Sequence, residues 1–391
     1  MRPSEKRGRC LASQEIRALV RNGMITRAPL EEKRIQPNSF ETTVAEEGYV
    51  VKGIFRPEPG KTVQETFDSM SQRDKRSFKI STEGTELKKG FTYLLPLEEG
   101  VILQKDWVLE SSPKSSCGRL FLGSRLIADY NPCFDKLNSQ YAQGKELRLY
   151  LLIQPQSFNV IVKPGMSLNQ IRFFSGRDAK LSSMEVIREL KRNAILSVRD
   201  GDGRMSPARS YISDELQVHV DLSGSRTSGV VGLRAIQNPE PIDLSKEGHY
   251  YVEHYFEPIL RINGKSKLKV YPGECLLLFS RECFDTPAHL NLKLRQHANL
   301  SFRGSSHDAG FIDSGFKGFL VFELKSDELT MIEFSDSDPI STLEVYRNLK
   351  PDKIYGTKAT GSHYQGQIGP QVAKFFKKID YTKLAQLPEK E

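Results

Sequence analysis

Residues 309–324 read AGFIDSGFKGFLVFEL and place one glutamate, Glu323, inside an apolar run. Residues 319–322 and 324 are apolar, so apolar side chains occupy both odd and even positions. A β-strand there would therefore be buried on both faces of its sheet. Burial would raise the pKa of the Glu323 carboxyl toward neutrality, and an unpaired buried charge is costly. Glu323 therefore needs a partner, such as Arg295 or Arg303, or a chemical task, and both interpretations stay open.

Short strand-like runs surround this stretch in both halves of the chain. Each is rich in Val, Ile, Leu, Phe and Tyr and is bounded by Gly or Pro. They are residues 49–55, 91–96, 147–153, 158–162 and 170–174 in the first half, and 216–222 and 230–235 in the second. Regularly interrupted short strands predict a mainly β protein of barrel or sandwich type.

Two helices are expected among these strands. Residues 11–23 carry apolar side chains at helical spacing, with Ser13 as a possible N-cap and Gly23 at the end. Residues 183–195, SMEVIRELKRNAI, form a charged amphipathic pattern. The helical content should therefore be small.

The chain has 391 residues, which is comfortable for two domains of roughly 100–200 residues each. Residues 90–116 and 273–297 share an order of glycine, apolar strand, turn and alternating strand, which is a weak internal repeat. We expect a first module over residues 1–180, a helical and polar linker over 181–212, and a second module over 213–391.

The net charge of +8 favours an anionic partner. The Lys and Arg residues are scattered rather than gathered into a stripe with stacking aromatics, so a phosphorylated small molecule or plain solubility explains the charge better than nucleic acid. No apolar stretch has the ~18–20 residues that a membrane span needs. The basic N-terminus does not resemble a signal peptide, so we expect a cytoplasmic protein.

The sequence lacks the usual ligand patterns of a transition metal. The five cysteines include no CxxC pair, and Pro132–Cys133 is not followed by the second cysteine of the zinc nucleobase deaminases. His249 and His254 are separated by tyrosines and are expected to pack rather than to bind metal. Phosphate-binding loops of the Walker type and dinucleotide fingerprints are also missing. We therefore predict no metal ligands in the protein.

Residues 114–119, KSSCGR, combine charge, hydroxyl donors and a glycine that allows close backbone approach. A polyphosphate requires these features together, although a solvated turn has the same composition. The segment 354–370, IYGTKATGSHYQGQIGP, joins flexible glycines to Lys, His, Tyr and Gln donors. That composition suits a lid over a phosphate group, with a linker as the alternative.

These features together resemble the dCTP deaminase branch of the dUTPase superfamily, in its longer two-module form. The family's Gln-Pro-x-Ser motif matches residues 36–39, and its basic-Ser-Ser-x-x-Arg motif matches Lys114, Ser115, Ser116 and Arg119. Its Ala-Gly-Phe-Ile-Asp-x-Gly-Phe string matches residues 309–316, with Glu323 ten residues after the aspartate. Its closing tail matches residues 363–370, with histidine in place of lysine. The resemblance implies two dUTPase-like distorted β-barrel, jelly-roll-like modules.

The resemblance also implies a role for each matching residue. Glu323 would take a proton from the water that attacks C4 of cytosine, and Arg119 and Ser115 would complete the catalytic group. Asp313 would hold the deoxyribose 3′-hydroxyl. The residues that would hold the triphosphate of dCTP or dUTP, with Mg²⁺, are Lys114, Ser115, Ser116, His363, Tyr364 and Gln367.

Each module departs from the family pattern in a different place. Leu151 stands where the first module should carry its glutamate, and Gln296 and His297 stand where the second should carry its serines. A complete site must therefore combine unlike modules, within a chain or between chains of a trimer-like homo-oligomer. Glu323 favours deamination of dCTP to dUTP and ammonia. A bifunctional enzyme that continues to dUMP, and a non-catalytic deoxynucleotide-binding protein, stay as alternatives.

Overall fold

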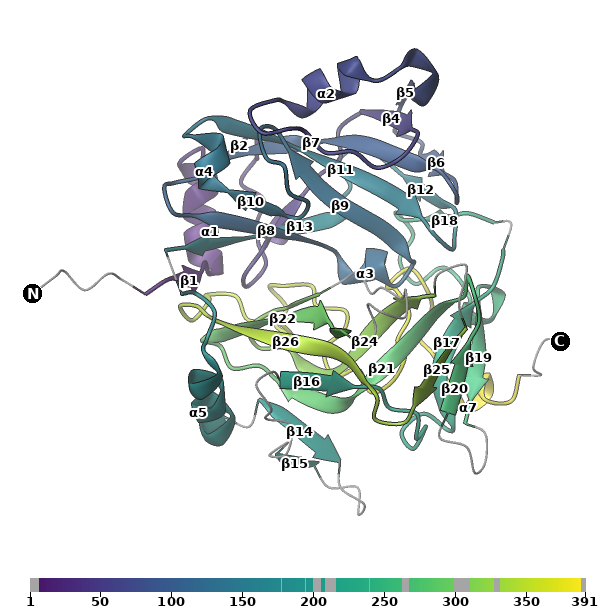
Figure 1. Cartoon of the computed structure of the whole chain (residues 1–391). Coiled ribbons are helices and arrows are strands. Elements are labelled where there is room, and N and C mark those ends of the chain that lie inside the picture. Colours follow the sequence, from purple (N-terminus) through teal and green to yellow (C-terminus); the bar gives the residue numbers. More distant parts are fainter. Residues whose placement is uncertain are drawn as a thin grey trace, which may run out of the picture.

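The chain folds into two β-rich modules, one above the other in Figure 1, with short helices at their edges. The expectation of a mainly β protein with two distorted barrels is confirmed. We call the sheets of β1–β13 the first module and those of β14–β26, with the C-terminal tail, the second. The computed structural model describes residues 7–176, 178–193, 195–199, 205–207, 216–238, 240–261, 267–298, 310–326 and 331–387.

The first module contains two main antiparallel sheets. One consists of β1 (Arg9–Cys10), β3 (Phe40–Thr42), β8 (Val108–Pro113), β10 (Lys136–Asn138) and β13 (Asn169–Ser175). The other consists of β2 (Ile25–Thr26), β4 (Glu47–Val51), β5 (Lys75–Lys79), β7 (Thr92–Ile102), β9 (Leu122–Ala128) and β11 (Glu146–Pro155). A third sheet pairs β6 (Thr85–Leu87) and β12 (Val160–Val162) with β18 (Ile242–Asp243). Since β18 comes from the second half of the sequence, the two halves share a sheet.

The second module repeats this plan. Its largest sheet consists of β14 (Leu196–Arg199), β15 (Met205–Pro207), β17 (Val230–Ala235), β19 (Phe256–Leu260), β21 (Cys275–Asp285) and β24 (Lys317–Lys325). The next consists of β16 (Leu216–His219), β22 (Leu290–Gln296), β23 (Phe311–Ile312) and β26 (Pro339–Arg347), and a third pairs β20 (Lys267–Val270) with β25 (Ile332–Ser335). The segment expected to be a linker contributes β14, which pairs with β21. Part of that segment thus belongs to the second module's sheet.

The helices of the described residues are short. They are α1 (Ser13–Arg21), α2 (Val63–Ser69), α3 (Ser115–Gly118), α4 (Ser139–Ala142), α5 (Ser183–Asn193) and α7 (Tyr381–Leu384), with 3₁₀ turns at Glu32–Arg34, Gln72–Asp74 and Val252–His254. The N-cap of α1 is Ala12 rather than Ser13, because the Ser13 hydroxyl donates instead to Asp352 beyond β26. Gly23 follows the helix with φ +66°, as its predicted stop requires.

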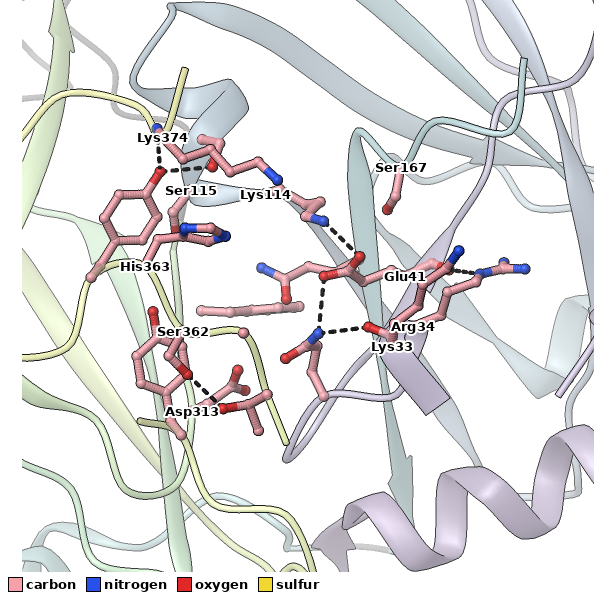
Figure 2. Close-up of a pocket in the computed structure, with 18 of the residues that line it drawn as sticks. Lys33, Arg34, Glu41, Lys114, Ser115, Ser167, Asp313, Ser362, His363 and Lys374 are labelled. Carbon is pink, nitrogen blue, oxygen red and sulfur yellow. Dashed lines mark hydrogen bonds and ion pairs between the residues drawn. The ribbon is translucent and has the colours of Figure 1, made fainter. Parts of the chain in front are cut away.

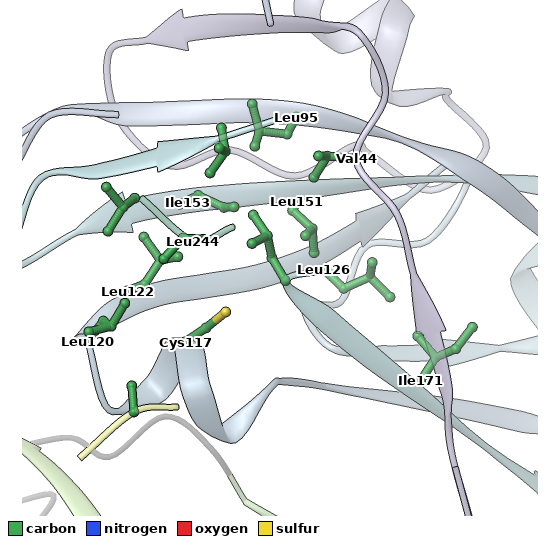
Figure 3. Packing of buried hydrophobic residues seen from close by; sticks show 14 of the residues in the cluster. Val44, Leu95, Cys117, Leu120, Leu122, Leu126, Leu151, Ile153, Ile171 and Leu244 are labelled. Carbon is green, nitrogen blue, oxygen red and sulfur yellow. The ribbon is translucent and has the colours of Figure 1, made fainter. Parts of the chain in front are cut away.

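One apolar core runs through the first module and into the second. Figure 3 shows Leu95, Leu126, Leu151 and Ile153 of the barrel packed together with Leu244, which follows β18. The same cluster extends to Leu277 and Val321 on β21 and β24, and a separate core fills the second barrel. The outer face of the β21–β24 pair is therefore buried against the first module.

Candidate functional site

A cavity of about 860 Å³ lies between the two modules and is lined by residues of both. Every residue expected in the site from the sequence lines it, and all belong to one chain: Lys114, Ser115, Ser116, Arg119, Asp313, Glu323, His363, Tyr364 and Gln367. Figure 2 shows Lys114 and Ser115 entering the cavity from the first module, with His363 of the tail beside Ser115 and with Asp313 further along the same cavity. The fold thus unites motifs that lie up to about 250 residues apart.

The KSSCGR segment forms the single turn of α3 directly after β8. Lys114 is its N-cap residue, and its Nζ lies 2.6 Å from Glu41 Oε2 (Figure 2). Ser116 lies behind it, where its Oγ is 2.7 Å from the hydroxyl of Tyr364 in the tail. The turn therefore presents one cation and two hydroxyls to the cavity, with backbone N–H groups at its start.

Arg119 connects the first module to the tail. Its guanidinium carbon lies 3.7 Å from the centre of the Tyr364 ring, and its Nη atoms donate to Gln367 Oε1 and to the carbonyl of Gln371, each at 3.0 Å. Such stacking and bonding fix both partners. In this state Arg119 therefore holds the tail in place over the cavity.

The tail is ordered against the start of β24. The Phe319 N–H donates to the Gln367 carbonyl at 3.1 Å, and the Gly366 N–H donates to the Lys317 carbonyl at 2.8 Å. Gly318 has φ +137°, and a Cβ there would lie 3.1 Å from the Gln367 backbone. A side chain at position 318 would displace the tail, so glycine is required for this close approach.

The positive wall of the cavity includes a residue that the motifs do not reveal, Lys374. Its Nζ forms an ion pair with Glu247, and both side chains line the cavity with His363. Burial, followed by the charge of Lys374, lowers the pKa of His363. His363 is thus biased toward its neutral form, unlike the lysine that the resemblance leads us to expect there.

Asp313 lies on the turn between β23 and β24. Its Oδ1 accepts a hydrogen bond from Arg172 Nη2 at 2.7 Å. Burial raises the pKa of Asp313, and the Arg172 charge opposes that rise. The next residue, Ser314, is held by Asn38 of the Gln-Pro-Asn-Ser motif.

Glu323 lies on β24, which is buried on both faces as expected. Its side chain is 3% exposed and lines the cavity. It shares the face of Val321 and lies opposite Leu277 of β21. Of the two arginines considered as structural partners, Arg295 pairs with Glu344 at 3.0 Å, while Arg303, like Ala309 of the Ile-Asp string, lies outside the described residues.

The strand register corrects the assignment of Leu151. The strands β7 and β21 both have 11 residues and begin two residues after a glycine, Gly90 or Gly273. The third residue of β21, Leu277, pairs with Glu323, and the third residue of β7, Leu94, pairs with Leu152. Leu152 is therefore the counterpart of Glu323, while Leu151 points into the barrel core (Figure 3). A one-residue slip reverses the face of a strand.

Gln296 and His297 stand apart from this cavity. Gln296 ends β22 and lines a separate cavity of about 430 Å³ beside α5, together with Arg295. The His297 ring lies 3.3 Å from the Gln217 side-chain nitrogen. Gln296 and His297 therefore do not line the cavity that Glu323 faces.

Among the described residues, no cluster of three or more His, Cys, Asp or Glu side chains has the arrangement of a metal site. In the same part of the chain, no helix is long and apolar enough to cross a membrane.

Two family models match nearly the whole chain. The 2′-deoxycytidine 5′-triphosphate deaminase (DCD) N-terminal domain matches residues 7–177, and the DCD C-terminal domain matches residues 188–376. The chain belongs to the dCTP deaminase family. The cavity between its modules thus lies between the two domains that define this family.

Individual relatives agree with this membership. A "dCTP deaminase, dUMP-forming" of Corynebacterium jeikeium is 36% identical over 110 residues, which are 27% of this chain and 58% of that protein. A protein of the same name from Streptomyces coelicolor is 32% identical over 116 residues, 29% of this chain and 61% of its own length. The chain thus spans about three fifths of these curated relatives.

A solved structure of a family member matches this chain over most of its length. The 2′-deoxycytidine 5′-triphosphate deaminase of Agrobacterium tumefaciens has a TM-score of 0.78 and 27% sequence identity. The match covers 89% of this chain and all of that one. The two-module arrangement is therefore shared with a family member of similar extent.

Proposed function

We propose that the chain catalyses hydrolytic deamination of dCTP to dUTP and ammonia, with Glu323 as general base and then general acid. The observation that carries the proposal is the position of Glu323. It is a buried carboxylate on the second module, and it faces the cavity that holds the serine motif of the first. A carboxylate that faces the cavity can exchange a proton with a water bound there.

In the proposed reaction one water is consumed and one ammonia is released. Glu323 takes a proton from the water as its oxygen bonds to C4 of cytosine. The carboxyl then delivers that proton to the ring nitrogen. It next takes the remaining proton of the new C4 hydroxyl and passes it to the amine, which leaves as ammonia as the C4–N bond breaks and C4=O forms. Ser115 and Arg119 would complete the catalytic group from the first module. No transition metal is required in this scheme.

The triphosphate would lie against the cationic and hydroxyl side of the cavity. The groups that would hold it are Lys114, Ser115, Ser116, His363, Tyr364 and Gln367, and Lys374 joins them because it lines the same wall. Asp313 would accept the deoxyribose 3′-hydroxyl. We further propose that this site is complete within each chain, whatever its oligomeric state.

Mg²⁺ would enter with the nucleotide rather than bind to a protein cage. The donor groups fit this role, because Glu41 and Glu247 supply hard oxygens at the cavity while both already pair with lysines. Mg²⁺ usually keeps several waters and binds through substrate phosphates. When bound, the ion would screen the phosphate charges.

A bifunctional enzyme is the second candidate. The relatives named above are called dUMP-forming, and dUTP made at this site could be cleaved to dUMP and pyrophosphate before it leaves. In that second reaction Asp313 would activate a water against the α-phosphorus.

One experiment tests both candidates. The wild-type protein and Glu323→Gln are incubated with dCTP and with dUTP, and ammonia and pyrophosphate are measured separately. Glu323→Gln should abolish ammonia release while nucleotide affinity stays within about tenfold, because the amide keeps the shape and loses proton transfer. Pyrophosphate release by the wild type would add the second activity.

A matched control separates catalysis from folding. Glu282 is a fully buried carboxylate on the neighbouring strand β21, bonded to His219 and away from the cavity. Glu282→Gln should keep deamination within about threefold even where it lowers stability. Wild-type ammonia release by Glu323→Gln would contradict the proposed mechanism.

A further inference from the structure

Two residues of the first module hold the turn that carries Asp313. Arg172 on β13 bonds to Asp313 itself, and Asn38, before β3, bonds to the adjacent Ser314. Both side chains belong to residues with no exposed surface. The turn between β23 and β24 is therefore supported by the other module.

Arg172 is fixed at several points. Its Nη1 donates to Asn291 Oδ1 and to the Leu292 carbonyl, both at 2.9 Å, while Nη2 donates to Asp313 Oδ1. Its guanidinium carbon also lies 4.1 Å from the centre of the Phe311 ring. A planar guanidinium held in this way fixes the direction of the Asp313 carboxylate.

The second oxygen of Asp313 is left for another donor. Within the described residues, Oδ2 accepts no hydrogen bond, and Asp313 lines the cavity together with Phe311 and Ile312. Arg172 itself does not line the cavity. Arg172 thus holds Asp313 without lining the cavity itself.

Asn38 fixes the same turn at its backbone. Its Oδ1 accepts from the Ser314 N–H at 3.0 Å and from the Ser314 hydroxyl at 2.8 Å. Ser314 Oγ lies 2.7 Å from the Leu290 carbonyl as well. The side chain and the backbone of the turn are therefore both positioned by the first module.

We infer that Arg172 is a positioning residue that aims Asp313 at the sugar 3′-hydroxyl, so that recognition of deoxyribose requires the two modules to be docked. This inference rests on the proposed function. It is supported by electrostatics, because burial raises the pKa of Asp313 and the Arg172 charge opposes this. Without Arg172 the pKa of the carboxyl would rise further, and the hydrogen bond that fixes its direction would be lost.

The test compares dCTP with 2′,3′-dideoxycytidine triphosphate, which lacks the 3′-hydroxyl. For the wild type, KM should be about 10- to 100-fold higher for the dideoxy substrate, because a charged acceptor is left unpaired. In Arg172→Met, KM for dCTP should rise to the dideoxy level, so the ratio falls to about 1–3. Because the proposal assigns proton transfer to Glu323 and not to this pair, kcat should change by less than about threefold. Asp313→Asn should give the same ratio.

The control is another buried ion pair that crosses the modules. Lys293 on β22 pairs with Glu110 on β8, beside the same Phe311 ring and without contact to Asp313. Lys293→Met should preserve the substrate ratio even where it lowers the melting temperature. Equal loss of the ratio in Lys293→Met and Arg172→Met would overturn the inference, because general loosening of the modules would then explain both.

Further outcomes separate this inference from the proposed function. If Arg172→Met fails to fold, Arg172→Lys, which keeps the charge but cannot reach all three acceptors, should show an intermediate ratio. A full wild-type ratio in either variant would contradict the inference. If the wild type deaminates dCTP and has the same KM for the dideoxy substrate, the inference about Arg172 is wrong while the proposed deamination stands. If no variant deaminates dCTP, calorimetric affinities for the two triphosphates give the same ratio test on binding alone.

Discussion

The two modules use equivalent strands for different purposes. In the first module the outer face of the β7–β11 pair carries Leu94, Leu152 and Tyr150, which pack beneath Val63 and Phe67 of α2. In the second module no helix of the described residues covers the outer face of the β21–β24 pair, and this face instead meets the first module, with Glu323 in the position of Leu152. In the first module α2 packs directly on this face of the sheet. In the second module the same face meets the other module across the cavity that Glu323 lines.

The phosphate motif shows the reverse division. In the first module the residues after β8 form α3 and face the cavity, with Lys114 paired to Glu41. In the second module the residues at the end of β22 are Arg295, which pairs with Glu344, and Gln296, which faces another cavity. Each module thus supplies what the other lacks.

The largest expected effect comes from giving the first module a carboxylate at the equivalent position. Leu152→Glu should lower the free energy of unfolding by at least about 3 kcal/mol, because the residue is buried under α2 without a polar partner. Chemical denaturation measures this loss. Leu152→Met, which conserves volume, should cost less than about 1.5 kcal/mol. Wild-type stability in Leu152→Glu would show that this face is not the packed surface described.

The next effect concerns the two phosphate motifs. Ser115→Ala with Ser116→Ala should lower kcat/KM for dCTP by about 100-fold or more, because two hydroxyls that face the charged substrate are lost. Gln296→Ala with His297→Ala should change it by less than about threefold. Steady-state kinetics on both double variants decide the point. Comparable losses in the two would mean that the modules are functionally alike.

The smallest effect concerns the tail. Because the pKa of His363 is lowered, it is neutral at pH 8 and gains its charge only as the pH falls through that lowered pKa. A lysine stays charged at both ends of this range, so His363→Lys should lower the KM for dCTP about two- to fivefold at pH 8. The advantage should shrink as the pH falls through the lowered pKa of His363. The ratio of variant to wild type cancels the titration of the substrate's own phosphate.

A KM ratio between variant and wild type that does not change with pH would exclude a titrating role for His363. The groups that set its local field are Lys374, Glu247, Lys114 and Glu41, which stay the same in both proteins. Lys374→Met therefore serves as the matched change on the same wall, with a loss of affinity that depends less on pH.

Short-range patterns predicted seven of the strands and the two longer helices, and the motifs shared with the dCTP deaminase family supplied the candidate residues that line the cavity. The sequence-based predictions were wrong or incomplete where contacts between distant parts of the chain determine the position of a side chain. The Ser13 hydroxyl bonds across the modules to Asp352 and leaves the cap of α1 to Ala12. Arg172 stands alone within an ordinary strand, so only the fold reveals its contact with Asp313. Lys374 was missed for the same reason, because it lies outside the tail motif and only the fold brings it to the cavity.

The position of Leu151 shows a different limit. Counting along a sequence fixes a strand position only to within a residue, and that residue decides which face a side chain occupies. The conclusion that the first module lacks the carboxylate survives, since Leu152 is also a leucine. Pairing with β7 was needed to identify the correct residue.

Mixing two inactive chains tests most directly whether each chain builds one site from its own unlike modules. One chain carries Ser115→Ala and Ser116→Ala, the other carries Glu323→Gln, and mass labelling of one chain reports whether subunits exchange. Since the serine motif and Glu323 line the same cavity of a single chain, deamination should stay absent in the mixture, exchanged or not. Recovery of deamination on mixing would contradict this, because the working site would then join the first module of one chain to the second module of another.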